Sequence, residues 1–155
     1  YFHWPFCVAK CPYCDFNSHV RDSVDQAAWL SALLADLRYE AALLPDRKIS
    51  SIFFGGGTPS QMPPATVAAL IAEADALWGL TETCEITLEA NPNSVEVANF
   101  AALAAAGVNR VSIGVQSFER QALEFLGRAH GADEARRAIT TAQAHFSRVS
   151  FDLIY

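Results

Sequence analysis

The chain alternates short apolar, β-branched segments with longer segments in which apolar residues recur every three or four positions. The short segments predict five β-strands, over 1–4, 49–54, 85–90, 110–115 and 149–154. The longer segments predict helices that follow a possible capping box at Ser23 and Gln26, and then over 64–77, 94–106, 120–126 and 132–145. Strands that alternate with helices in this way predict right-handed crossovers and a parallel sheet.

The pattern also limits the architecture. Five strand–helix repeats without a dinucleotide-binding fingerprint favour part of a (β/α) barrel over a doubly wound sheet. The first residue is Tyr1, and the last five residues continue a predicted strand. We therefore expect residues 1–155 to form a single α/β core domain, the N-terminal part of a longer protein whose remaining barrel strands and C-terminal domain are absent.

Composition and charge exclude several classes of protein. The 155 residues are 52% hydrophobic and 18% charged, which is a globular rather than a disordered composition. The formal net charge is −6 and no basic block is present, so we expect no nucleic-acid partner. No apolar run approaches the ~20 residues of a transmembrane helix.

Polar residues and glycines lie at the end of each predicted strand. In a parallel sheet the carboxyl ends of the strands lie on one rim, and ligand-binding and catalytic residues are usually found there. These sets are the cysteine loop 7–14, the glycine-rich segment 55–59, the acidic turn 89–92, segment 114–118, and Asp152 with Tyr155. Their shared rim predicts a single site.

Three of the four cysteines, Cys7, Cys11 and Cys14, fall within eight residues. Clustered thiols are typical of metal ligands in a reducing compartment, so we expect the chain in the cytoplasm. Zinc would need a fourth ligand, such as His3 or His19. A four-iron cluster held by three cysteines leaves one iron open for a substrate or cofactor. The spacing favours the cluster, with zinc and free thiols as the alternatives.

The segment Gly55-Gly56-Gly57-Thr58 follows the second main strand. Glycines permit positive φ and the close approach of backbone groups to a small charged ligand. No Gly-Lys-Ser/Thr follows, so the segment is not a phosphate-binding loop. The alternative is a tight strand-to-helix turn.

The cysteine spacing, the aromatic residue before the third cysteine and the G-G-G-T-P segment resemble the radical S-adenosylmethionine (SAM) superfamily. The resemblance implies a [4Fe–4S] cluster on Cys7, Cys11 and Cys14, whose open iron chelates SAM. It also implies a fold of the radical SAM type, with the glycine-rich segment beneath the methionyl group of SAM.

A longer set of motifs resembles, in order, the family that contains oxygen-independent coproporphyrinogen III oxidase and the heme chaperone HemW. The motifs are H-W-P-F-C-x3-C-P-Y-C-D-F-N-S, L-E-A-N-P, G-V-Q-S-F, L-G-R-A-H and F-D-L-I-Y. By position, this resemblance implies SAM contacts, some to a second SAM in the oxidase, for Tyr1, Tyr13, Gly56, Gly57, Thr58, Glu89, Gln116, Arg128 and Asp152.

Phe16 separates the two branches of that family. The oxidase branch has a further cysteine two residues after the third cluster ligand, where this chain has Phe16. The resemblance therefore favours a heme chaperone that binds heme and transfers it to an acceptor protein. The alternatives are the oxidase, which abstracts hydrogen from coproporphyrinogen with a 5′-deoxyadenosyl radical, and a zinc-stapled α/β binding module. Heme or a porphyrinogen, an acceptor protein and an electron donor are the expected partners.

Simpler roles are open for other residues. Glu89 and Asp152 could each anchor a loop, and Arg128 could be an exposed surface arginine. His130 is predicted to cap a helix and His145 to be solvated. Cys84 is expected to be a small buried thiol, and the stripe that begins at Trp29 is expected to pack in the core.

Overall fold

The computed structural model describes all residues, 1–155, and its centre is a five-stranded parallel sheet. Its strands, in spatial order, are β1 (Phe2–Trp4), β4 (Ile49–Gly56), β5 (Leu80–Ala90), β6 (Arg110–Gln116) and β7 (Arg148–Leu153). This order is also the order along the chain. In a (β/α) barrel each new strand is added next to the previous one, always on the same side. In a doubly wound sheet the direction in which strands are added reverses partway. The structure confirms the α/β class and the parallel sheet.

Helices cover one face of the sheet. They are α1 (Gln26–Leu43), α2 (Pro64–Trp78), α3 (Ser94–Val97), α4 (Phe100–Ala105), α5 (Arg120–Phe125) and α6 (Ala132–His145), with a short 3-10 turn η1 (Pro59–Gln61). Alternate strand residues such as Phe54, Leu88 and Ile113 are completely buried in one core cluster with residues of α2, α4 and α6. The other set of alternate residues is largely polar: Arg110 donates to Thr87 and to Ser150.

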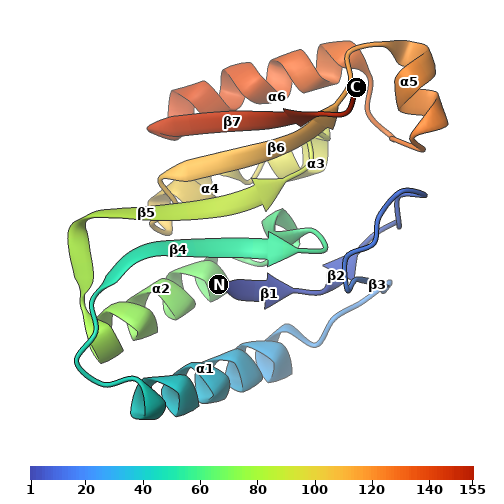
Figure 1. Cartoon of the computed structure of the whole chain (residues 1–155). Helices are drawn as coiled ribbons and strands as arrows, with labels where there is room; N and C mark the ends of the chain where they lie inside the picture. Colours follow the sequence, from blue (N-terminus) through green and yellow to red (C-terminus); the bar gives the residue numbers. More distant parts are fainter.

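All predicted strands form, and β4 and β5 extend beyond their predicted bounds. Because the strands are parallel, their carboxyl ends lie on one edge. In Figure 1 the arrowheads of β4, β5 and β6 point toward the side where the loop after β2 and α5 lie.

Two details of the predicted helices are wrong. Helix α1 starts at Gln26 with Asp25 as its N-cap, because the Asp25 carboxylate accepts a hydrogen bond from the backbone N–H of Ala28. The single helix expected over 94–106 is two short helices, α3 and α4, separated at 98–99. The stripe from Trp29 does pack against the core, although no residue of α1 is fully buried.

A second, two-stranded parallel sheet was not predicted. It pairs β2 (Phe6–Cys7) with β3 (His19–Val20), and the backbone N–H of His19 also donates to the carbonyl of Pro5 at 2.7 Å. The pair joins the two ends of residues 8–18 and so closes the cysteine loop. None of the helices is both long and apolar enough to cross a membrane.

Candidate cofactor site at the carboxyl edge of the sheet

The cysteine loop extends from the end of β2 beyond the carboxyl edge of the sheet. Cys7 is buried, Cys11 and Cys14 are partly exposed, and none of the three is in a disulfide. The backbone N–H of Cys14 donates to the carbonyl of Cys11 at 3.0 Å, which forms a turn that contains Pro12 and Tyr13. The loop therefore presents three free thiols on one short segment.

The glycine-rich segment after β4 packs directly against Cys7. The Thr58 backbone N–H donates to the carbonyl of Phe6 at 2.9 Å, and its hydroxyl lies 3.5 Å from the Cys7 sulfur as a donor. A Cβ at Gly57 would lie 2.9 Å from the same sulfur and 2.7 Å from the Phe6 carbonyl oxygen. Glycine is required at Gly57 because the two backbones approach too closely for any side chain.

Arg128 attaches the other part of the loop to the sheet. Its Nη1 donates to the Cys11 sulfur at 3.2 Å and to the Tyr13 hydroxyl at 3.4 Å. Its Nη2 donates at 2.7 Å both to the side-chain oxygen of Asn91 and to the carbonyl of Gly114. Arg128 is thus a half-buried residue that links three segments, and not a free surface arginine.

Gly127, immediately before Arg128, also contacts the loop. Its φ is +63°, and a Cβ there would lie 2.8 Å from Cδ of Pro12. Both the left-handed backbone and the contact with Pro12 require glycine. The end of α5 is therefore shaped to receive the cysteine loop.

An acidic pair lies at the ends of β5 and β7. The Glu89 carboxylate accepts a hydrogen bond from the Gly56 backbone N–H at 3.2 Å. Burial raises the pKa of Glu89, the Gly56 hydrogen bond lowers it in part, and the charge of Asp152 raises it further. The strands that carry Glu89 and Asp152 are separated in the sheet by β6. Tyr1 stacks on Phe53 with ring centroids 5.9 Å apart and approaches Glu89, whose charge adds to burial in raising the pKa of Tyr1.

Gln116 has an unusual backbone at the end of β6. Its φ is +67°, which is rare for a residue with a side chain and costs conformational energy. Its amide nitrogen would be 3.1 Å from a Cβ at Gly114, the residue whose carbonyl also accepts from Arg128. The structure therefore brings Gln116 to the same edge as Arg128.

Two of the histidines contact backbone carbonyls. His3 Nε2 contacts the backbone carbonyl of Asn17 at 2.9 Å, across the neck of the cysteine loop. His130 does not cap α6: its Nε2 lies 2.9 Å from the Val115 carbonyl, while Gly131 is the N-cap without a side-chain hydrogen bond. Burial and the neighbouring charge of Arg128 lower the pKa of His130. His145 is exposed, and Cys84 is buried, as expected.

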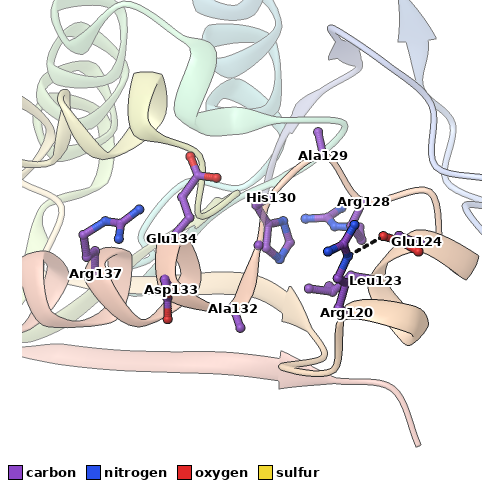
Figure 2. A pocket seen from close by; sticks show the side chains of 11 residues that line it. Arg120, Leu123, Glu124, Arg128, Ala129, His130, Ala132, Asp133, Glu134 and Arg137 are labelled. Atoms are coloured by element: carbon purple, nitrogen blue, oxygen red, sulfur yellow. Dashed lines mark hydrogen bonds and ion pairs between the residues drawn. The ribbon is translucent and has the colours of Figure 1, made fainter.

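A surface cleft of about 560 Å³ opens between α5 and the start of α6. Figure 2 shows His130 and Arg128 side by side in it, with an Arg120–Glu124 ion pair at the α5 side. None of the loop cysteines lines this cleft. Arg128 is the one predicted site residue that lines this cleft.

The residues at this edge suit an iron–sulfur cluster and a small charged ligand by their chemistry. Three free thiols are soft ligands. The Nε of Arg128 is buried without a hydrogen-bond partner, which leaves one donor for a bound group. No three Cys, His, Asp or Glu side chains of residues 1–155 lie close enough together to hold a single metal ion.

One residue of the edge was missed in the sequence. Glu96 is 3% exposed and its carboxylate accepts from four donors: the Ser60 hydroxyl, the Asn91 backbone N–H, and the side-chain amides of Asn91 and Asn93. The spacing of Asn93 and Glu96, three apart at a helix start, is the signal that would have found it.

The whole chain, residues 1–155, matches the family model of the radical SAM superfamily. The heme chaperone HemW of Escherichia coli (strain K12) is 46% identical over 92% of the chain and 38% of that protein. The radical S-adenosyl methionine domain-containing protein 1, mitochondrial, of Bos taurus is 44% identical over 99% of the chain and 35% of that protein. The chain thus spans little more than a third of these relatives.

A solved structure gives the same fold. Coproporphyrinogen III oxidase (HemN) from Escherichia coli, titled a radical SAM enzyme, superposes with a TM-score of 0.87 at 28% identity. The match covers 99% of this chain and 36% of that one. The predicted fold of the radical SAM type, as part of a larger protein fold, is confirmed.

Proposed function

The chain belongs to the radical SAM superfamily, and from this premise we propose that it is the cofactor-binding part of a heme chaperone. The complete protein would bind heme and transfer it to an acceptor protein, with the cluster and SAM enabling the transfer. Its thiols need a reducing compartment, and we place it in the cytoplasm.

In this proposal Cys7, Cys11 and Cys14 hold a [4Fe–4S] cluster. The bound cluster would supply an open iron for SAM and an electron received from a donor protein. Thr58 and Arg128 keep the loop in place, because each donates a hydrogen bond to a cysteine sulfur. Hydrogen bonds to the sulfurs also stabilise negative charge on a cluster.

The remaining predicted residues are proposed to bind SAM. Gly56 and Gly57 let this segment pack tightly against His3 and Cys7 beside the proposed cluster, and Arg128 Nε offers a free donor. Glu89 and Asp152 form an acidic pair that would attract the positive charges of SAM and accept hydrogen bonds from it. Tyr1, Tyr13 and Gln116 lie around the same edge and complete the set.

The presence of Phe16 is the observation that favours the chaperone over the oxidase. It is 57% exposed at the mouth of the cysteine loop and cannot act as the additional thiol of the oxidase branch. The second candidate is coproporphyrinogen III oxidase, which is favoured by the high TM-score to the Escherichia coli enzyme. A zinc-stapled binding module is the third, and the three free thiols are its only support.

The test uses the full-length protein, reconstituted with iron and sulfide without oxygen. One sample receives SAM, reductant and coproporphyrinogen III, and its porphyrin products are analysed by mass spectrometry. A second receives heme, then an apo-form heme protein as acceptor, and heme transfer is followed by absorbance. We expect heme binding and transfer without loss of propionate carboxyls.

Two other results would decide against the chaperone. Catalytic decarboxylation of coproporphyrinogen III would identify the oxidase. A colourless protein that binds one zinc ion on these cysteines and takes up no iron would identify the binding module.

A further inference from the structure

Glu96 is a buried carboxylate without a salt-bridge partner, and it is hydrogen-bonded to two segments that contact the cysteine loop. It is 3% exposed at the start of α3 and accepts four hydrogen bonds, so its charge is stabilised by polar donors alone. None of the site residues predicted from the sequence has this degree of burial together with so many partners.

The first connection passes through Asn91 and Arg128. The Asn91 side-chain nitrogen donates to Glu96 at 3.2 Å, and its oxygen accepts from Arg128 at 2.7 Å. Only one orientation of the amide allows both contacts, because a carboxylate can only accept and a guanidinium can only donate. Arg128 in turn donates to the sulfur of Cys11.

The second connection passes through the glycine-rich segment. The Ser60 hydroxyl in η1 donates to Glu96, and Ser60 follows Thr58, whose hydroxyl donates to the sulfur of Cys7. Ser60 is completely buried, so this hydrogen bond is shielded from water. Glu96 thus joins the segments that contact two different cysteines.

We propose that Glu96 is a positioning residue that sets the placement of Cys11 and Cys7 relative to the SAM-binding edge through Asn91–Arg128 and through Ser60. This inference rests on the proposed cluster and deepens it. The carboxylate fixes the amide of Asn91, and the amide of Asn91 fixes the guanidinium of Arg128.

Glu96→Gln breaks the connection in a defined way. In either orientation the glutamine amide places N–H groups against donors: against the Asn91 backbone N–H and the Ser60 hydroxyl, or against the side-chain nitrogens of Asn91 and Asn93. Either mismatch displaces Asn91, so Arg128 loses one of the two acceptors of its Nη2 and keeps only the Gly114 carbonyl. The hydrogen bond from its Nη1 to Cys11 is then less well fixed. A cluster with a weaker hydrogen bond to one cysteine sulfur is harder to reduce.

The experiment measures the midpoint potential and the SAM affinity of reconstituted full-length proteins. We expect E96Q to lower the midpoint potential of the cluster and to weaken SAM binding about tenfold. This is the size of effect seen when a residue that hydrogen-bonds to a metal ligand is lost. E134Q is the matched control: the Glu134 carboxylate accepts from the Ser94 backbone N–H of the same loop at 2.9 Å but has no contact with Asn91. It should leave both quantities at wild-type values.

N91A provides a second variant that leaves the Glu96–Ser60 contact intact. If Glu96 acts through Asn91, the potential of the E96Q/N91A double variant should lie no lower than that of the single variants. Additive shifts would show that Asn91 is not the intermediary and would overturn the connection.

The outcomes separate the inference from its premise. If E96Q melts at a lower temperature but keeps the wild-type potential and SAM affinity, Glu96 is a structural residue and the inference is wrong. If wild-type protein forms no cluster, the proposed function itself is contradicted and the role of Glu96 with it. If E96Q does not fold, the single N91A variant must still lower the potential.

Discussion

The sheet and the cysteine loop are held in place by different means. The sheet is stabilised by one cluster of 21 buried residues, among them Leu88, Ile113 and Phe100, each completely buried. The loop is largely exposed, with Val8 73% and Phe16 57% accessible. It is positioned by contacts with segments that are distant in the sequence.

This difference separates stability from cofactor binding. Burial of apolar side chains stabilises the sheet, whether or not the loop is in place. The loop's contacts from Thr58, Gly127 and Arg128 each involve one or two atoms and contribute little to folding, yet they set where the thiols lie. Substitutions in the two regions should therefore change different measured quantities.

The largest expected effect is loss of the cluster. Replacing Cys7, Cys11 or Cys14 singly with alanine should abolish the brown colour and the iron content of reconstituted protein, because each thiolate is a ligand in the proposal. Cys84→Ala should keep the cluster and cost only about 1 kcal/mol of unfolding free energy. A cluster that survives all three single substitutions in the loop would overturn the assignment of the ligands.

The second expected effect is a loss of stability that leaves the cofactor site intact. Leu88→Ala removes a completely buried side chain near the carboxyl end of β5 and should lower the free energy of unfolding by about 2–5 kcal/mol. The fraction of molecules that remains folded should bind SAM with wild-type affinity. Urea denaturation and a SAM titration below the transition measure both quantities, and a matching loss of affinity would show that core and loop are coupled.

A third, smaller effect compares two glycines with positive φ. Gly127→Ala and Gly79→Ala should both lose about 1 kcal/mol of stability from the left-handed backbone. Only Gly127→Ala should also weaken cluster retention, because its Cβ meets Pro12, whereas a Cβ at Gly79 meets no atom within 4 Å. Equal retention of iron in the two variants during gel filtration would argue against the role of this contact.

The smallest expected effect concerns Glu89 and pH. Its folded-state pKa is raised, mainly by burial, so its contribution to stability is fully present below its unfolded pKa and is lost as pH rises through the folded value. At neutral pH, Glu89→Gln should therefore raise the melting temperature of cofactor-free protein slightly, by no more than about 2 °C after screening by solvent.

The same substitution should weaken SAM binding, because the amide lacks the negative charge of the acidic pair. The gain in melting temperature should vanish at about pH 3, well below the ordinary pKa of a glutamate, because the carboxyl is then protonated in both states. A lower melting temperature at neutral pH would show that the Gly56 hydrogen bond to Glu89 outweighs its burial.

The sequence predicted the sheet well because each strand has β-branched or aromatic residues, and the strand over 49–54 ends at Gly55. The sequence predicted that the candidate site residues lie at one edge, because parallel strands place their carboxyl ends together. The start of α1 was predicted wrongly because both Ser23 and Asp25 are good N-cap residues, and only the three-dimensional structure shows that Asp25 bonds to Ala28.

Features that depend on distant segments could not be predicted. The β2–β3 pair joins two-residue strands too short to have a periodic pattern. The role of Glu96 depends on Ser60, 36 residues earlier, and its burial depends on tertiary packing. His130 was expected to cap the adjacent helix, but tertiary packing places it against the Val115 carbonyl of β6.

The most direct test of the central claim is electron paramagnetic resonance of the reduced, reconstituted full-length protein with and without SAM. The account predicts a [4Fe–4S]⁺ signal that changes when SAM is added, and no such signal in the Cys11→Ala variant. A wild-type signal that is identical with and without saturating SAM would contradict an open iron at this edge of the sheet.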